Sequence, residues 1–320
     1  MSAIAADLKP GAAGGIPEPP VKAVRRLFST PWTSMVVVLI AVLWTVPTFG
    51  LLVTSVRPAT DVANTGWWTF FIHPHVTGSN YSSVLLGGGY NTAGGLSSFF
   101  VNSLVIAIPG ALFPLAIATM AAYALAWVKF RGSDFIFFLI FALQVVPIQM
   151  ALIPLLRLYS TGFHIGSIQI VPPLLFNESD WAFARLWISH TMFALPLAIF
   201  LLHNFMSQLP RDLMEAATMD GANHFVTFRK IVLPLALPAI ASFAIFQFLW
   251  VWNDLLVALT FGNTSTQPLN ARLEQQVGNF GSHLELLTAG AFVSIIVPLI
   301  VFLSLQRYFV RGLLAGSVKG

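Results

Sequence analysis

The chain of 320 residues contains no cysteine. Disulfide bridges, thiolate metal sites and cysteine nucleophiles are therefore excluded. Charged residues are also scarce, at 9% of the chain against 57% hydrophobic residues, and the mean hydropathy is +0.80. Because soluble domains carry roughly a quarter charged residues, this composition predicts a protein embedded in a lipid bilayer.

Motifs of several common enzyme classes are absent as well. The chain has no G-x-x-x-x-G-K-[ST] loop for ATP phosphates, no H-E-x-x-H and no G-x-S-x-G, and its seven His are scattered. Its sixteen Lys and Arg are spread along the chain, so the net charge of +4 does not indicate nucleic-acid binding. We expect no catalytic residue, metal or cofactor on this chain, and any ATP and Mg²⁺ to be held by a partner.

Long apolar runs dominate the sequence. About 20 apolar residues cross the bilayer core as a helix, and six segments are long enough. These candidate spans are about Thr33–Val56, Val101–Val128, Phe135–Leu158, Trp181–Phe205, Val232–Phe261 and Leu284–Phe309. The sequence thus predicts an all-α integral membrane protein with six transmembrane helices over residues 33–310. Residues 1–32, with five Pro and three Gly, are expected to be a disordered tail, and residues 311–320 a second tail.

The distribution of Lys and Arg predicts the orientation. With six spans, twelve of these residues fall on the side of the two termini and four on the other. Cytoplasmic loops carry the excess of positive charge, so both termini are expected in the cytosol. The outer loops are then residues 57–98, 159–180 and 262–283, and the sequence does not decide whether the last two carry short helices.

Seven prolines lie within or at the ends of the spans, and they leave two interpretations open. One is that these prolines are simply tolerated, since prolines are common in membrane helices. Alternatively, they bend the helices around a cavity that opens and closes. They are Pro109, Pro114, Pro147, Pro154, Pro196, Pro234 and Pro238.

The longest charged passage between two spans is Leu209–Pro238, with six charges in the twenty residues from Arg211 to Lys230. Pro210 suits the first turn of a helix, and Gly221 suits a chain reversal. We therefore predict a helix, a tight turn and a second helix from about Asn223 at the cytosolic surface. Composition alone favours an amphipathic loop without a partner.

The spacing within this passage favours a partner. The residues Glu215-Ala216-Ala217, Asp220-Gly221-Ala222, Phe228, Ile231, Leu233-Pro234 and Pro238 resemble the EAA loop of permease subunits in bacterial ABC importers. The resemblance implies a type I ABC importer permease fold in which residues 209–233 form a coupling helix that seats in a cleft of an ATPase subunit. The residues implied to make this contact are Glu215, Ala216, Ala217, Asp220, Gly221, Ala222 and Phe228.

Two further stretches narrow the resemblance. Residues 306–320 look like the tail of carbohydrate permeases of the maltose-transporter type, which contacts the ATPase pair and here would use Gly316, Lys319 and Gly320. Residues 247–259 and 89–103 are similar to the α-glucoside branch. The resemblance implies a sugar importer of the bacterial cytoplasmic membrane, for an α-glucoside such as maltose or trehalose. Its implied partners are a second permease subunit, two ATPase subunits, an extracytoplasmic sugar-binding protein and membrane lipid.

Polar residues inside spans are candidates for the substrate path, because lipid-facing ones are costly. At 100° per residue, Phe243, Gln247, Trp250 and Asp254 share one stripe of the fifth span, and Asn253 points away from Asp254. An aromatic ring beside carboxylate and amide groups suits a sugar. The polar residues of the third and fourth spans, Gln144, Gln149, His190 and Asn204, are interpreted as hydrogen-bonding groups between helices.

Two other classes of function remain as alternatives. An intramembrane enzyme would need a converging nucleophile and base, or a pair of intramembrane Asp, and the sequence shows neither. A stand-alone secondary transporter or channel would be expected to show internal repeats and coupling-ion carboxylates near mid-membrane. Neither is apparent, and the charged loop would then have no purpose.

Overall fold

The computed structural model describes residues 31–87, 95–128, 130–173, 182–277 and 283–317. Side chains are described up to residue 306. The expected disordered tail therefore lies outside the described residues except for its last two, which begin the first helix.

The elements, in chain order, are α2 (Pro31–Ser55), α3 (Ala59–Asn64), η1 (Trp67–Phe71), α4 (Ser79–Leu86), α5 (Ser97–Trp127), α6 (Ser133–Leu143), α7 (Ile148–Thr161), β1 (Phe163–Ile165), β2 (Ile168–Val171), α8 (Ala182–Met206), α9 (Arg211–Met219), α10 (His224–Thr227), η2 (Phe228–Val232), α11 (Leu233–Asn253), α12 (Leu256–Phe261), η3 (Thr264–Thr266), α13 (Leu269–Val277) and α14 (Leu284–Ser317).

Membrane-spanning helices make up most of the fold, as predicted. Five helices among the described residues are long and apolar enough to cross a bilayer, and α6 with α7 provides a sixth span if the bent pair counts as one. The expected bounds of the first, second, fourth and sixth spans agree with the helices to within a few residues, except that α14 continues to Ser317. The all-α prediction omitted one small element, the antiparallel hairpin of β1 and β2.

The third span is not the continuous helix that was expected over Phe135–Leu158. Helices α6 and α7 meet at an angle of 99°. The physical reason lies at Pro147, which precedes α7 with φ −59° and ψ 133°. A proline has no N–H to donate and disfavours the helical conformation of the residue before it, so the chain turns here.

The fifth span is also interrupted. Instead of one helix over Val232–Phe261, α11 ends at Asn253 and α12 begins at Leu256. Asp254 adopts an extended conformation between them, with ψ 131°. Its Oδ2 accepts hydrogen bonds from the backbone N–H groups of Val257 and Ala258, at 2.9 and 3.2 Å. The carboxylate thus caps α12. The sequence prediction, which placed Asp254 on one face of a continuous helix, did not include this cap.

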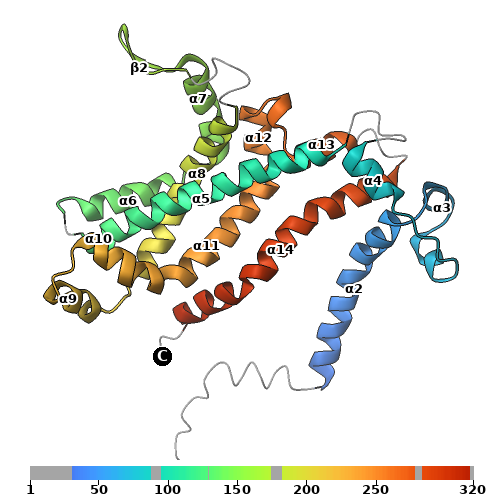
Figure 1. The fold of residues 1–320 in the computed structure, drawn as a ribbon, viewed down its shortest axis with the longest axis horizontal. Helices are drawn as coiled ribbons and strands as arrows, with labels where there is room; N and C mark the ends of the chain where they lie inside the picture. Colours follow the sequence, from blue (N-terminus) through green and yellow to red (C-terminus); the bar gives the residue numbers. More distant parts are fainter. Residues whose placement is uncertain (1–30, 88–94, 129, 174–181, 278–282, 318–320) are drawn as a thin grey trace, which may run out of the picture.

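Helices α5, α8 and α11 form the centre of the bundle (Figure 1). Small residues line the close approach of α5 and α8, and small side chains let two membrane helices come near each other. The fully or almost fully buried alanines of these two helices are Ala107, Ala111, Ala118, Ala122, Ala194 and Ala198. The α9–α10 pair projects from one end of the bundle, while α3, α4 and α13 lie at the other (Figure 1).

Helix α2 stands away from this bundle along most of its length (Figure 1). Its buried residues are confined to its last turns, Gly50 and Val53 to Ser55. Earlier residues are exposed, up to 83% for Trp44. This apolar surface is suited to lipid or to another membrane subunit.

The loops opposite the α9 end contain regular structure. Residues 57–98 carry α3, η1 and α4, and the buried Arg57 holds this segment by donating to Gly66 O, Asp61 O and the hydroxyls of Thr65 and Thr69. The other two loops also contain regular structure in the parts that the structure describes. Residues 159–180 contain the hairpin, and residues 262–283 contain η3 and α13.

Candidate functional site

The passage from residue 209 to 238 forms the predicted helix, turn and helix. Helix α9 follows Pro210, with Asp212 in its first turn. Gly221 reverses the chain with φ 77°, a value in the left-handed region that favours glycine. The side chain of Asn223 then accepts a hydrogen bond from Val226 N at 2.9 Å and caps α10. The π-helical turn η2 joins α10 to α11, so the pair continues directly into a long membrane helix.

The residues implied to contact an ATPase divide into two groups. Glu215, Ala216, Asp220 and Gly221 are exposed. Ala217 is buried, while Ala222 and Phe228 are half-buried. The second group therefore lies on the packed side of the helix pair. In addition, Ala222 N donates to Ala217 O at 2.9 Å across the turn.

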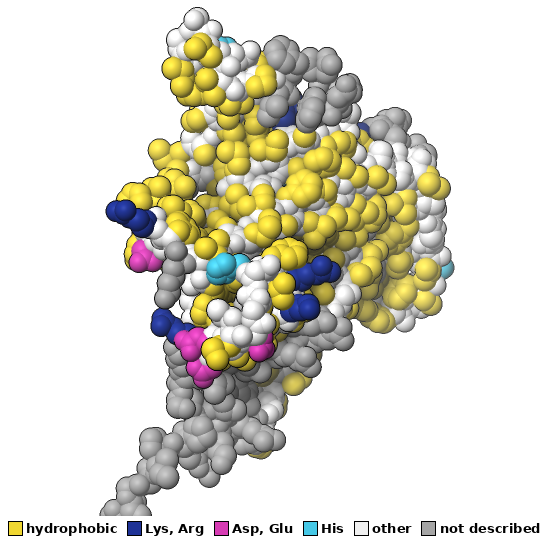
Figure 2. Space-filling view, turned by 60° about the vertical axis from the view of Figure 1, so that its left-hand side comes forward, with side chains coloured by type: hydrophobic (Ala, Val, Ile, Leu, Met, Phe, Trp, Pro, Cys, Tyr) yellow, Lys and Arg dark blue, Asp and Glu magenta, His cyan; other side chains and the backbone are white. Residues whose placement is uncertain are grey.

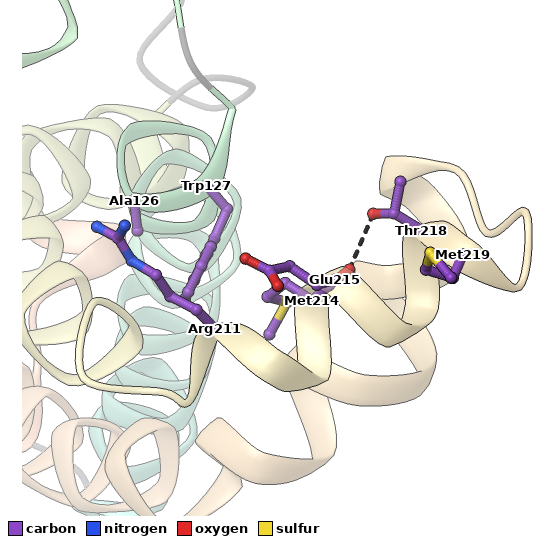
Figure 3. A pocket seen from close by; sticks show the side chains of 7 residues that line it. All are labelled: Ala126, Trp127, Arg211, Met214, Glu215, Thr218 and Met219. Carbon is purple, nitrogen blue, oxygen red and sulfur yellow. Dashed lines mark hydrogen bonds between the residues drawn. The ribbon is translucent and has the colours of Figure 1, made fainter.

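A groove of about 600 Å³ runs between α9 and the end of α5. Its lining side chains come from both helices: Ala126, Trp127, Arg211, Met214, Glu215, Thr218 and Met219 (Figure 3). Met219 is 88% exposed at the outer end of α9. Figure 2 shows charged side chains gathered at this end of the molecule, beside a wide hydrophobic flank. The groove thus combines an apolar floor with charged edges, which suits a protein partner.

The helix pair is tied to the membrane helices by aromatic side chains of α5. The hydroxyl of Tyr123 lies 3.1 Å from His224 Nδ1 and donates to His224 O at 3.2 Å. The rings of Tyr123 and Phe228 have centroids 5.0 Å apart. One turn later, Trp127 Nε1 donates to Met206 O of α8 at 3.1 Å. The helix pair is therefore in direct contact with α5 as well as continuous with α11.

A second feature, which we call the polar pocket, lies among α7, α8, α11 and α12. It has a volume of about 160 Å³. Its lining residues are Ile148, Gln149, His190, Phe193, Gln247, Trp250, Asp254, Leu256 and Val257. The closest approach of the His190 and Asp254 side chains is 3.9 Å, from Nε2 to Oδ2. Gln149 and Leu256 are exposed at the rim, so the pocket is reachable from outside the chain.

The polar pocket brings together three of the five residues proposed from sequence for the substrate path, namely Gln247, Trp250 and Asp254. It does not include the other two. Phe243 is buried in the apolar cluster around Ala118 and Leu202. Asn253 is exposed, and its side chain donates to Leu249 O of its own helix at 2.8 Å.

Sequence reasoning missed two residues of the polar pocket. Gln149 and His190 were interpreted as groups that hydrogen-bond between helices, but both line the pocket. The signal for Gln149 was its position two residues after Pro147, where the bend directs α7 toward α12. Nothing in the pattern around His190 distinguishes it from a structural histidine.

No group of three or more His, Asp or Glu that could hold a metal ion occurs in the part of the chain that the structure describes.

The chain is similar to known membrane transport proteins. Residues 114–314 match the family described as "Binding-protein-dependent transport system inner membrane component". The chain is 49% identical over 286 residues to the osmoprotective compounds uptake permease protein GgtD of Synechocystis sp., covering 88% of this chain and 89% of that protein. It is 50% identical over 249 residues to the alpha-glucoside transport system permease protein AglG of Rhizobium meliloti, covering 77% of this chain and 61% of that protein.

Among solved structures, the fold is similar to a chain from a bacterial ABC transporter involved in the import of the acidic polysaccharide alginate. The TM-score is 0.65 at 20% sequence identity, with 89% of this chain and 98% of that chain covered. At this identity the likeness concerns the fold alone.

Proposed function

Because the chain belongs to the family of binding-protein-dependent transport system inner membrane components, we propose that it is one of two different permease subunits of an ATP-driven sugar importer. It is a multi-pass membrane protein, and half of the translocation pathway would run through it. The remaining subunits would be a second permease, two ATPase subunits and an extracytoplasmic sugar-binding protein. ATP and Mg²⁺ would be held by the ATPases, since this chain has no phosphate-binding loop.

The proposed orientation places both termini and the α9–α10 pair in the cytosol. It is supported by the twelve Lys and Arg that fall on that side, against four on the other.

The proposed coupling element is α9 with the turn at Gly221. The exposed Glu215, Ala216 and Asp220 would contact the ATPase, with the small Ala216 allowing close approach and the carboxylates making charge-assisted bonds. The buried Ala217, with Ala222 and Phe228, would hold the pair rigid against α5. The single observation that carries the proposal is the continuity of this pair, which leads through η2 directly into α11 and hence to the polar pocket.

The proposed second contact with the ATPases is the C-terminal tail. Gly316 lies in the last turn of α14. Lys319 and Gly320 lie outside the described residues. Their proposed role rests on the resemblance of residues 306–320 to carbohydrate permeases.

The proposed substrate class is a neutral α-glucoside. It is supported by the alpha-glucoside permease from Rhizobium meliloti at 50% identity, of which the chain covers 61%. The sugar would pass beside Gln247, Trp250 and Asp254. Much of the selectivity would still reside in the binding protein and the second permease.

The proposal predicts ATP-driven uptake by the assembled complex only. The four kinds of subunit would be reconstituted in proteoliposomes and tested with radiolabelled maltose and trehalose. Uptake should require ATP, the binding protein and this chain. Equal uptake by this chain alone without ATP would contradict the proposal and indicate a stand-alone transporter or channel.

A further inference from the structure

The polar pocket contains two buried polar atoms without a partner among the described residues. The Gln247 side chain is 1% exposed, and its Nε2 donates to Gly110 O at 3.2 Å, but its Oε1 has no hydrogen-bond partner. His190 is 6% exposed, and its Nε2 also has no hydrogen-bond partner, although Asp254 Oδ2 lies 3.9 Å from it. A buried polar atom without a hydrogen-bond partner is destabilising, so both atoms are suited to a ligand or to water.

The carboxylate of Asp254 adds a third polar group. Its Oδ2 is oriented by two backbone N–H groups of α12, and a carboxylate has about four acceptor positions in total. Because these bonds fix the orientation of the carboxylate, Asp254 faces the pocket in a defined direction. The lining includes no Lys or Arg among the described residues, so this acidic group has no balancing cation there.

The remaining walls are apolar and aromatic. Trp250, Phe193, Ile148 and Val257 surround the three polar groups. Sugars present C–H faces that pack on aromatic rings and hydroxyls that both donate and accept, which matches an amide oxygen, an imidazole nitrogen and a carboxylate around a ring. The volume of about 160 Å³ limits a ligand to about the size of one sugar ring, because a disaccharide contains two such rings.

We infer that the polar pocket is a binding subsite for one neutral hexose ring, held by His190, Gln247 and Asp254, and that it disfavours acidic sugars. This inference rests on the proposed function and deepens it, because it assigns a direct sugar contact to this subunit. The disfavoured class follows from charge. A second carboxylate brought within about 4 Å of Asp254 would be repelled, because like charges at this separation interact strongly in a site that is largely shielded from water.

The absence of cysteine allows a site-specific test. Gln149→Cys places a single thiol of this chain at the exposed rim of the polar pocket, and Met150→Cys places one on the next residue, which is 69% exposed and outside the lining. The complex of the two permeases and two ATPases would be purified without the binding protein. The rate of maleimide labelling of each thiol would then be measured against increasing glucose or glucuronate, which differ only in a hydroxymethyl or a carboxylate group.

Glucose is expected to slow the labelling of Gln149→Cys and to leave Met150→Cys unchanged. Glucuronate should need at least about a tenfold higher concentration for the same protection. Adding Gln247→Met, which keeps the length of the side chain but removes its amide, should raise the half-protecting glucose concentration about tenfold or more. Asp254→Asn retains a residue that caps helices well, and it should bring the protecting concentrations of glucose and glucuronate closer together.

Two results would overturn the inference. One is equal labelling of Gln149→Cys with and without glucose, in a complex whose maltose or trehalose uptake is ATP-dependent. The proposed importer function would then be retained, and the polar pocket would hold only water. The other is protection that Gln247→Met leaves unchanged. If uptake fails but glucose protects, the proposed importer is wrong while the sugar subsite remains.

Discussion

Replacing Gly221 with Val is expected to reduce ATP-driven uptake at least tenfold, whereas Gly221→Asn should retain most of it. Gly221 has φ 77° and connects α9 to α10. A Cβ added at this position meets no atom within 4 Å, so neither substitution is blocked by a clash at Cβ, and the two differ in how readily they adopt the backbone conformation. The left-handed conformation costs an ordinary residue about 1–2 kcal/mol, and a β-branched residue adopts it least readily, while Asn tolerates it.

The effect on uptake follows from the role of the turn in holding α9. If the chain leaves the left-handed conformation, the bond from Ala222 N to Ala217 O is lost and α9 is no longer held in a fixed direction. Uptake, membrane insertion and co-purification with the ATPase would be measured for both variants. Insertion should be unchanged, and the ATPase should be lost with Val but retained with Asn. Equal uptake by wild type and Gly221→Val would show that transport does not depend on this turn.

A second large effect, on the stability of the complex, is expected when Trp252 is replaced with Ala. Trp250, on the same helix, is expected to have a different role. Trp252 is 2% exposed and donates to Ser294 O of α14 at 3.1 Å. Its ring lies against Phe248 and Phe100, each with centroids 5.9 Å away. Removing a buried aromatic ring costs about 3–5 kcal/mol, so Trp252→Ala should lower the unfolding temperature of the complex by on the order of 10 °C.

Trp250→Ala is the matched comparison on the same helix. Trp250 is half-buried and lines the polar pocket rather than the core. We expect its loss to leave assembly and unfolding temperature nearly unchanged but to lower sugar uptake severalfold, or to uncouple ATP hydrolysis from uptake. Fluorescence-detected thermal unfolding and proteoliposome uptake would separate the two variants. An equal fall in unfolding temperature for both, or unchanged uptake by Trp250→Ala, would remove Trp250 from the proposed pathway.

The sequence predicted the features that depend on the composition of a whole segment. Runs of about 20 apolar residues located the spans because hydrophobic length is the dominant constraint in a bilayer. The helix, turn and helix at residues 209–233 were also predictable, since Pro210, Gly221 and Asn223 each act within a few residues.

The features that sequence reasoning missed depend on contacts between segments. Pro147 is one of seven prolines for which the sequence leaves tolerance and bending open, and an angle of 99° depends on what the following helix packs against. Asp254 was placed on a continuous helix because nothing nearby in sequence shows that its carboxylate caps α12. Similarly, Ala217 was assigned to a contact surface, and only the packed structure shows it turned inward.

The central claim is that α9 contacts the ATPase, and a single introduced thiol tests it most directly. Met219→Cys would place the only cysteine of this chain on the exposed tip of α9, 88% exposed in the wild type. Ile165→Cys, on the hairpin far from α9, provides the control at a residue that is 62% exposed (Figure 1). Both variants would be treated with a short bifunctional crosslinker in membranes that contain the complete complex.

The proposed coupling role predicts a crosslinked product between Met219→Cys and the ATPase subunit, and none from Ile165→Cys. The yield should change when ATP is added, because closure of the ATPase pair would move the helix. A Met219→Cys chain that forms no product with the ATPase, in a complex that still imports sugar, would contradict the claim.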